Sequence, residues 1–131
     1  MTRRTLYNRV WYHGSPEDLT ELATGSTITP NRALARAFSH KPTLVCLEDD
    51  GAIRHNGIRA GTLYRIDEPL APNDIYPHPR STMPEGLEWL TRRPLRLRRL
   101  GRTRIRQDER LEEEEVRALL ARGERAKQER S

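Results

Sequence analysis

The sequence predicts one small α+β domain, built from short strands with a single early helix. Its 131 residues, of which 34% are hydrophobic, are enough for one modest core. The apolar runs are short and are bounded by glycine and proline, as in strands, whereas residues 33–38 repeat apolar side chains with a helical period. Residues 111–120 repeat them more weakly and predict a peripheral C-terminal helix. No run is long enough for a membrane span or a secretory signal, so we expect a cytoplasmic protein without a membrane partner.

The first predicted strand covers residues 6–13, which are rich in aromatic and β-branched side chains and are followed by a Gly-Ser-Pro turn. This placement puts His13 at a strand end. Thr29 then supplies an N-cap and Pro30 the first position of the helix, which we expect to end near Ser39 before the next proline.

Further strands are predicted at residues 42–47, 61–66, 87–90 and 94–97. In the last of these, alternate leucines face the core and alternate arginines face solvent. Residues 67–85 contain five prolines and form an unusually long connection. Loops of this size usually carry function or cover a site.

The chain divides by composition into a domain at residues 1–101 and a charged helix and tail at residues 102–131. The spacing of Glu113 and Arg117 favours an ion pair along that helix, and the polar end of the chain predicts a frayed terminus. Eight arginines between residues 92 and 106 precede four consecutive glutamates. Such an arginine-rich strand is either solvated surface or a docking site for phosphates or an acidic partner.

Metal and cysteine chemistry find little support in the sequence. The single cysteine, Cys46, lies in an apolar run and is interpreted as a small buried hydrophobe. The four histidines have no cysteine or carboxylate partner at zinc-like spacing, so no metal is expected. His55 begins a His-Asn-Gly sequence that is typical of a tight turn.

The tetrapeptide Tyr12-His13-Gly14-Ser15 resembles the Tyr-His-Gly-Thr of the ADP-ribosyltransferases, in particular the small rifampin-modifying type, and more distantly the His-Tyr-Glu class that includes diphtheria toxin and the poly-ADP-ribose polymerases. The resemblance covers residues 12–97. It implies a small split-sheet core and NAD as substrate. His13 would then hold a ribose hydroxyl and the Gly14 backbone the nicotinamide amide, with Tyr12 and Ser15 beside them.

The Ser-Thr-Ile-Thr segment that includes Thr27 and Thr29 resembles the strand that leads into a helix in the same family. The His-Tyr-Glu class has a stacking tyrosine where this chain has Thr27, so a ring would have to come from elsewhere, for instance Tyr12, Tyr64 or Tyr76. The segment also resembles the Ser-Thr-Ser motif of the arginine-specific toxins. As a purely structural alternative, Thr29 is a helix cap.

Two acidic residues match positions that are functional in the family. Glu88 lies at the start of a late strand, where a glutamate of the His-Tyr-Glu class stabilises the transition state. The alternatives are that Glu88 is a surface glutamate, or that Glu85, three residues earlier, takes its place. Asp74 follows a strand similar to the one that ends in Val-Glu-Pro in the rifampin-modifying enzymes. The same loop presents Tyr76, His78 and Arg80 as candidates for acceptor binding.

The sequence therefore predicts NAD-dependent transfer of ADP-ribose to an unidentified protein, nucleic-acid or small-molecule acceptor, with release of nicotinamide. Two alternatives stay open. The domain is a catalytically inactive module whose arginine-rich strand binds nucleic acid or an acidic protein, or it is a partner protein of an unrelated effector that docks through its C-terminal helix.

Overall fold

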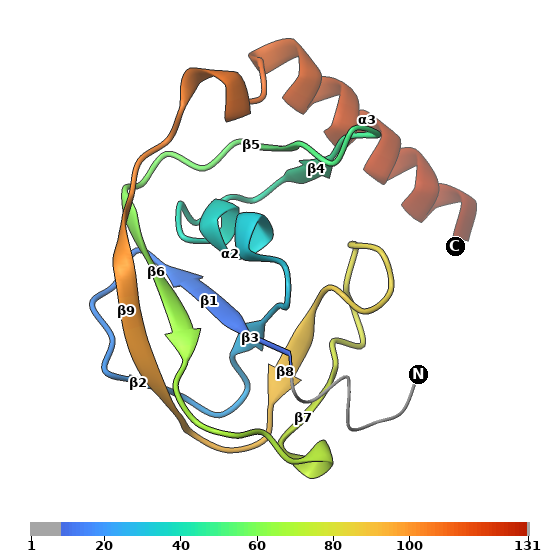
Figure 1. The fold of residues 1–131 in the computed structure, drawn as a ribbon. Coiled ribbons are helices and arrows are strands. Elements are labelled where there is room, and N and C mark those ends of the chain that lie inside the picture. The colour runs from blue at the N-terminus through green and yellow to red at the C-terminus, as the bar shows by residue number, and fades with distance from the viewer. Residues whose placement is uncertain (1–8, 131) are drawn as a thin grey trace.

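The computed structural model describes residues 9–130, with side chains described as far as Gly123. The chain folds as an α+β protein around a four-stranded antiparallel sheet (Figure 1). Its strands lie in the order β1 (Tyr12–Ser15), β6 (Gly61–Ile66), β9 (Leu95–Thr103) and β2 (Glu21–Leu22).

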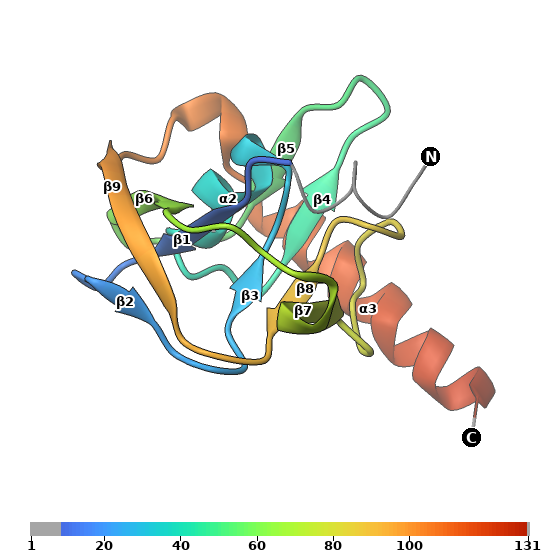
Figure 2. The same ribbon diagram turned by 60° about the horizontal axis from the view of Figure 1, so that its bottom comes forward.

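A second, three-stranded sheet lies beside one end of the first (Figure 2). It contains β3 (Thr27–Ile28), β8 (Trp89–Thr91) and β7 (Ile75–Pro77), while β4 (Val45–Leu47) and β5 (Ile53–His55) form a separate hairpin. The remaining elements are helical: α2 (Arg32–Phe38), the 3-10 turns η1 (Pro72–Asp74) and η2 (Gln107–Glu109), and α3 (Glu113–Arg130). Neither α-helix in the described part of the chain is long and apolar enough to span a membrane.

The hydrophobic core fills the space between the two main sheets. Because strand residues alternate between faces, every second side chain of β6 and β9 points into this space. Trp11 and Trp89 meet edge to face there, with ring centroids 5.5 Å apart. The buried members of the core are Trp11, Leu22, Ile28, Ile66, Ile75, Trp89 and Leu95.

Helix α2 packs on the opposite face of the four-stranded sheet, and glycines allow its close approach. A Cβ atom on Gly14 would lie 1.8 Å from the carbonyl oxygen of Ala35, and one on Gly61 would lie 2.2 Å from that of Ser39. No side chain fits at either position. The helix is therefore seated directly on the backbone of β1 and β6.

A bulge on β9, opposite Leu63 and Tyr64 of β6, leaves Leu100 as an extra residue and shifts the register, so that β9 has two halves. Before the shift, Leu95 is buried and faces the core, while Arg98 is exposed on the other face. After it, Thr103 faces α2, where its hydroxyl lies 2.6 Å from that of Ser39. The predicted alternation of leucine and arginine thus holds in the first half alone.

Several predicted elements match the structure, and others need correction. The strand at residues 61–66 is confirmed, whereas the first strand begins later, at Tyr12, and continues into the predicted Gly-Ser-Pro turn as far as Ser15. Residues 6–8 of that predicted strand lie outside the described residues. His13 therefore lies within β1. The pairing of Gly14 with Leu63 and of Ser15 with Thr62 on β6 extends the strand past Gly14.

The helix cap was predicted at the wrong residue. Asn31 is the N-cap of α2, because its side-chain oxygen accepts the Leu34 N–H at 3.0 Å. Thr29 instead accepts the Asn31 N–H, and Pro30 precedes the helix. Strand β5 was missed because it has only three residues, of which Ile53 alone is apolar. The His-Asn-Gly sequence there ends a strand rather than forming a positive-φ turn.

The seat of α2 yields a stability test. We expect Gly14→Ala to lower the free energy of unfolding by about 2 kcal/mol or more, because the added methyl group meets backbone that cannot rotate away. The matched control is Gly123→Ala in α3, where nothing lies within 4 Å of the new Cβ, and it should be neutral or stabilising. Urea unfolding of both variants measures the difference, and equal midpoints would contradict the packing argument.

Candidate functional site

The candidate site lies where β1 and β3 part. Tyr12 and Thr29 join the two strands by reciprocal backbone hydrogen bonds of 2.8 and 3.0 Å. One residue further along β1 the backbones have separated, and the His13 side chain spans the gap by donating from Nδ1 to the Thr27 carbonyl at 2.7 Å. A pocket opens beside this contact.

The pocket has a volume of about 210 Å³ and draws its lining from both sheets and α2. Six of its lining residues were candidates from the sequence, and two, Ala35 and Phe38, were not. The lining residues are Tyr12, His13, Gly14, Thr27, Thr29, Ala35, Phe38 and Glu88. Residues that are up to 76 positions apart in the sequence, such as Tyr12 and Glu88, thus meet at one cavity.

His13 is held in a defined protonation state. Burial lowers its pKa, against the opposing effect of the hydrogen bond to Thr27, so the imidazole is neutral at pH 7. Because a carbonyl accepts only, Nδ1 carries the proton, and Nε2 is left with a lone pair. The ring therefore offers an acceptor suited to a hydroxyl group.

Gly14 contributes backbone rather than side chain. In an antiparallel pair, successive residues alternate between bonding to the neighbouring strand and pointing away from it. Tyr12 bonds to Thr29, on the side away from β6, and Gly14, two residues on, has the same orientation. Its N–H and C=O therefore point towards the β3 side, where the pocket opens, in the arrangement that a carboxamide requires.

Glu88 approaches from the second sheet, immediately before β8. Its Oε1 atom accepts a hydrogen bond from the Ser81 hydroxyl at 2.8 Å, and its backbone carbonyl accepts one from the His78 N–H at 2.9 Å. These contacts connect the carboxylate to the proline-rich loop. The loop thus positions an acidic group at the pocket rather than covering it.

The other candidate residues do not line this pocket. The Asp74 carboxylate forms an ion pair with Arg93 at 2.9 Å, a contact that holds the pKa of Asp74 below its ordinary value. Tyr76 stacks under Arg92 at 4.2 Å. Ser15 is buried and accepts the Glu17 N–H. In the loop, His78 accepts the Arg80 N–H, and both side chains lie outside the pocket lining.

Aromatic surface at the pocket comes from Tyr12 and Phe38. Tyr64, which the sequence offered as a substitute ring, is 1% exposed, and its hydroxyl is held by Glu17 and Leu19. The sequence placed Phe38 on the apolar face of the helix and did not predict it as a site residue. That face does pack on β1, but Phe38, at its C-terminal end, lines the pocket.

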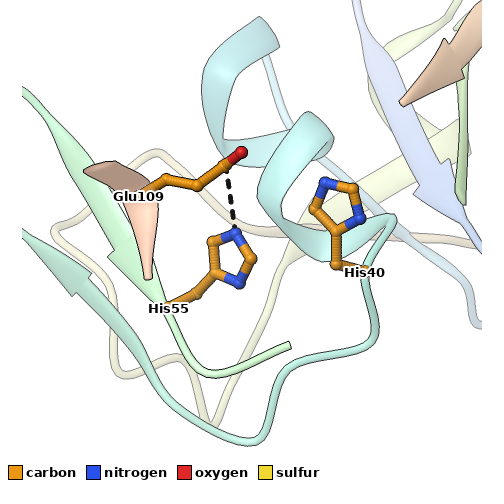
Figure 3. A group of neighbouring side chains, drawn as sticks. All are labelled: His40, His55 and Glu109. Carbon is orange, nitrogen blue, oxygen red and sulfur yellow. Dashed lines mark hydrogen bonds and ion pairs between the residues drawn. The ribbon is translucent and has the colours of Figure 1, made fainter. Parts of the chain in front are cut away.

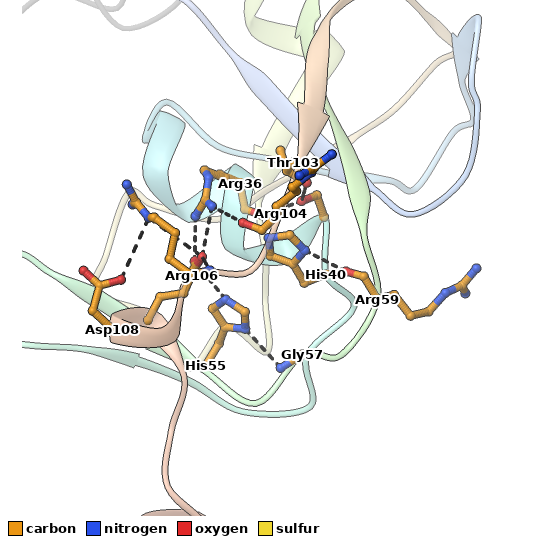
Figure 4. A network of polar contacts seen from close by, with 11 residues as sticks. Arg36, His40, His55, Gly57, Arg59, Thr103, Arg104, Arg106 and Asp108 are labelled. Carbon is orange, nitrogen blue, oxygen red and sulfur yellow. Dashed lines mark hydrogen bonds and ion pairs between the residues drawn. The ribbon is translucent and has the colours of Figure 1, made fainter.

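A second polar cluster lies beyond α2 (Figure 3). The ligand atoms of His40, His55 and Glu109 lie within 4.8 Å of one another, and the three side chains are buried. They were missed because they lie on three separate elements, 15 and 54 residues apart, so no zinc-like spacing connects them. Figure 4 shows that Arg36 and the end of β9 enclose the same cluster.

Hydrogen bonding describes this cluster better than metal ligation does. His55 accepts the Gly57 N–H at Nδ1, so its Nε2 carries the proton and donates to Glu109 at 3.2 Å. Arg36 grips both oxygens of the same carboxylate, at 2.6 and 2.9 Å. A dication would have to displace the His55 proton and would lie next to a guanidinium, which opposes binding.

The cluster serves as a latch, defined here as Arg36, His55 and Glu109, that joins α2, β5 and η2. Burial raises the pKa of Glu109, but hydrogen bonds from Arg36, the Arg106 N–H and His55 outweigh this effect and hold the pKa at about 2. His40 stacks on His55, with centroids 5.3 Å apart, and donates from Nδ1 to the Arg59 carbonyl. Burial lowers the pKa of His40.

The chain matches no protein-family model, no curated protein and no solved structure.

The latch predicts a specific loss of stability in acid. Since the pKa of Glu109 is lower in the folded chain than its ordinary value of 4.5, its contribution is present above about pH 5 and is lost as the pH falls towards 2. Glu109→Gln should cost about 3 kcal/mol at pH 7, because it leaves Arg36, whose side chain is only 24% exposed, without its anion.

Urea unfolding at pH 7 and at pH 3 tests this prediction. The variant should lose less stability than the parent chain between the two pH values. Glu113→Gln on α3 is the control, because its carboxylate is 83% exposed and, among the described side chains, forms an ion pair with Arg117 alone. An equal pH dependence for parent and Glu109→Gln would contradict the assignment.

Proposed function

We propose that the chain is an ADP-ribosyltransferase-like domain that cleaves NAD at the pocket between β1, β3 and β8 and transfers ADP-ribose to an acceptor. The observation that carries the proposal is the convergence of His13 and Glu88, from two different sheets, on one cavity. The split between β1 and β3 supports the same reading, because it creates the cavity that the resemblance requires.

The size of the pocket limits which part of NAD it takes. Its volume of about 210 Å³ is below the roughly 300 to 1,000 Å³ of ordinary ligand pockets. It therefore suits nicotinamide and its ribose, with the pyrophosphate and adenosine outside. The Gly14 N–H and C=O would pair with the carboxamide, while Tyr12 and Phe38 would supply the apolar walls.

The reaction breaks the bond between C1′ of the ribose and the ring nitrogen of nicotinamide. The bonding electrons leave with the ring, which becomes neutral nicotinamide, and positive charge develops on the ribose. The acceptor then bonds to C1′ through an oxygen or nitrogen and releases its proton to solvent. Water in place of the acceptor gives ADP-ribose and one proton.

Two side chains act on this step. His13 accepts a hydrogen bond at Nε2 from a ribose hydroxyl and so fixes the sugar. Glu88 places a negative charge near the developing cation, and its hydrogen bond from Ser81 holds the carboxylate in position. Asp74 is not assigned to catalysis, since its carboxylate is neutralised by Arg93.

Glu88→Gln should lower the rate of nicotinamide release from labelled NAD about 100-fold or more, because an amide cannot stabilise the developing charge. Glu85→Gln is the matched control: its side chain is exposed in the same loop and does not line the pocket. Nicotinamide release by the parent chain, with protein, oligonucleotide and small-molecule acceptors supplied in turn, is the measurement. Absence of release in every case, or an equal loss in both variants, would refute the catalytic role of Glu88.

Phe38→Ala should raise the KM for NAD several-fold and leave kcat nearly unchanged, because the ring contributes apolar wall and no chemistry. Tyr76→Ala removes an aromatic side chain outside the pocket and should leave both constants unchanged. Steady-state kinetics over a range of NAD concentrations distinguish the two. A fall in kcat with unchanged KM for Phe38→Ala would show that the pocket wall is assigned wrongly.

A further inference from the structure

Four exposed arginines form a surface beside the pocket. The proposed NAD chemistry does not use this surface. We name this surface the arginine strip. Three members lie on strands β6 and β9, on the face of the four-stranded sheet that also carries α2, and these strands run side by side in Figures 1 and 2. The fourth member lies at the start of α2 itself. The members are Arg32, Arg65, Arg96 and Arg98.

Strand register places the strip and the pocket next to each other. Tyr12 pairs with Arg65, and Arg65 pairs with Arg98, so the three side chains form one row across β1, β6 and β9. At the other end of the row, the Arg32 guanidinium lies over the Tyr12 ring, 5.8 Å from its centroid. Since Tyr12 also lines the pocket, the strip begins at the pocket wall.

The central pair lacks a counter-charge within the described chain. Arg65 and Arg98 lie directly opposite each other, a like-charged arrangement that destabilises a sheet. Among residues 9–123, no carboxylate comes within 4.0 Å of either guanidinium. An anion from outside would remove this repulsion.

Arg96 is compensated only in part. Its side chain is 72% exposed, and its guanidinium lies 3.9 Å from Glu68, whose carboxylate is already held by Arg93 at 2.5 Å. Glu21 lies opposite Arg96 in the register with β2. Arg96 and Arg65 also line a hollow of about 450 Å³, to which Trp11 and Leu70 contribute apolar surface.

We propose that the arginine strip binds the backbone of a single-stranded nucleic acid, with an unpaired base against the Tyr12 ring. Arg96 and Arg98, two positions apart on one strand, are separated by roughly 7 Å, a spacing suited to successive phosphates. An aromatic ring between guanidinium groups is the arrangement that holds single strands, because bases stack while phosphates pair with the cations. An acidic protein surface would use the charges but not the ring.

Binding of a fluorescent 20-nucleotide single strand, followed by anisotropy without NAD, tests the proposal. The paired variant Arg65→Ala with Arg98→Ala should bind at least tenfold more weakly than the parent chain. Its dependence of log affinity on log salt should be shallower by about 1.4, the value for two lost phosphate contacts on a single strand. Thermal unfolding should show an unchanged or higher melting temperature, because a like-charge pair has been removed.

The charge-matched control is Arg117→Ala with Arg122→Ala on α3, which removes the same net charge away from the strip. It should retain affinity. An equal loss in both variants, no binding by the parent at 50 mM salt, tighter binding of the matching duplex, or equal binding of polyglutamate would each overturn the proposal. Because NAD is absent, these outcomes are independent of whether nicotinamide is released.

Discussion

The architecture depends on the short backbone connection between Tyr12 and Thr29. These two residues join the four-stranded and three-stranded sheets by a pair of hydrogen bonds, and beyond them the strands diverge. Had the ladder continued, the carbonyl of Thr27 and the backbone of Gly14 would have satisfied each other. Instead, the His13 side chain bridges the gap, and unpaired strand edge faces a cavity. A small chain thereby gains a pocket that combines apolar walls with polar backbone groups, without an additional domain.

Sequence reasoning predicted the class of the fold, the strand at β6 and the helix at α2, because these depend on local pattern. The grouping of Tyr12, His13, Gly14 and Glu88 was implied by the family resemblance, and these four residues line one pocket. What sequence reasoning could not predict depends on contacts between distant segments. Asp74 was a candidate on the basis of loop position, and nothing local indicated that Arg93 would pair with it. The sequence gives Phe38 only as part of an apolar helix face, and its place in the pocket lining becomes visible once the helix packs against β1.

The latch also depends on contacts between distant segments, and these contacts contribute to stability rather than to the pocket. Arg36, His55 and Glu109 are polar residues on three elements, and each alone would be assigned to the surface. In the folded chain, His55 and Glu109 are buried and Arg36 is partly buried. Arg36 and His55 both donate hydrogen bonds to the Glu109 carboxylate, which would otherwise be buried without a partner. These contacts hold η2 against α2, so the segment before α3 packs on the rest of the domain. The boundary expected at residue 101 falls inside β9.

The bulge opposite Leu63 and Tyr64 has a consequence for how the chain tolerates changes in length. It sets two halves of β9 in opposite phase, so Arg98 on one side and Thr103 on the other both reach the face that carries α2. Leu100 is the extra residue of this bulge, because Arg99 pairs with Tyr64 and Gly101 pairs with Leu63. Deleting Leu100 would restore regular alternation along β9 and leave Arg98 and Thr103 on the faces that they now occupy. The core would keep its leucines and α2 its contact with Thr103, so the chain should tolerate the loss of one residue at this point of β9.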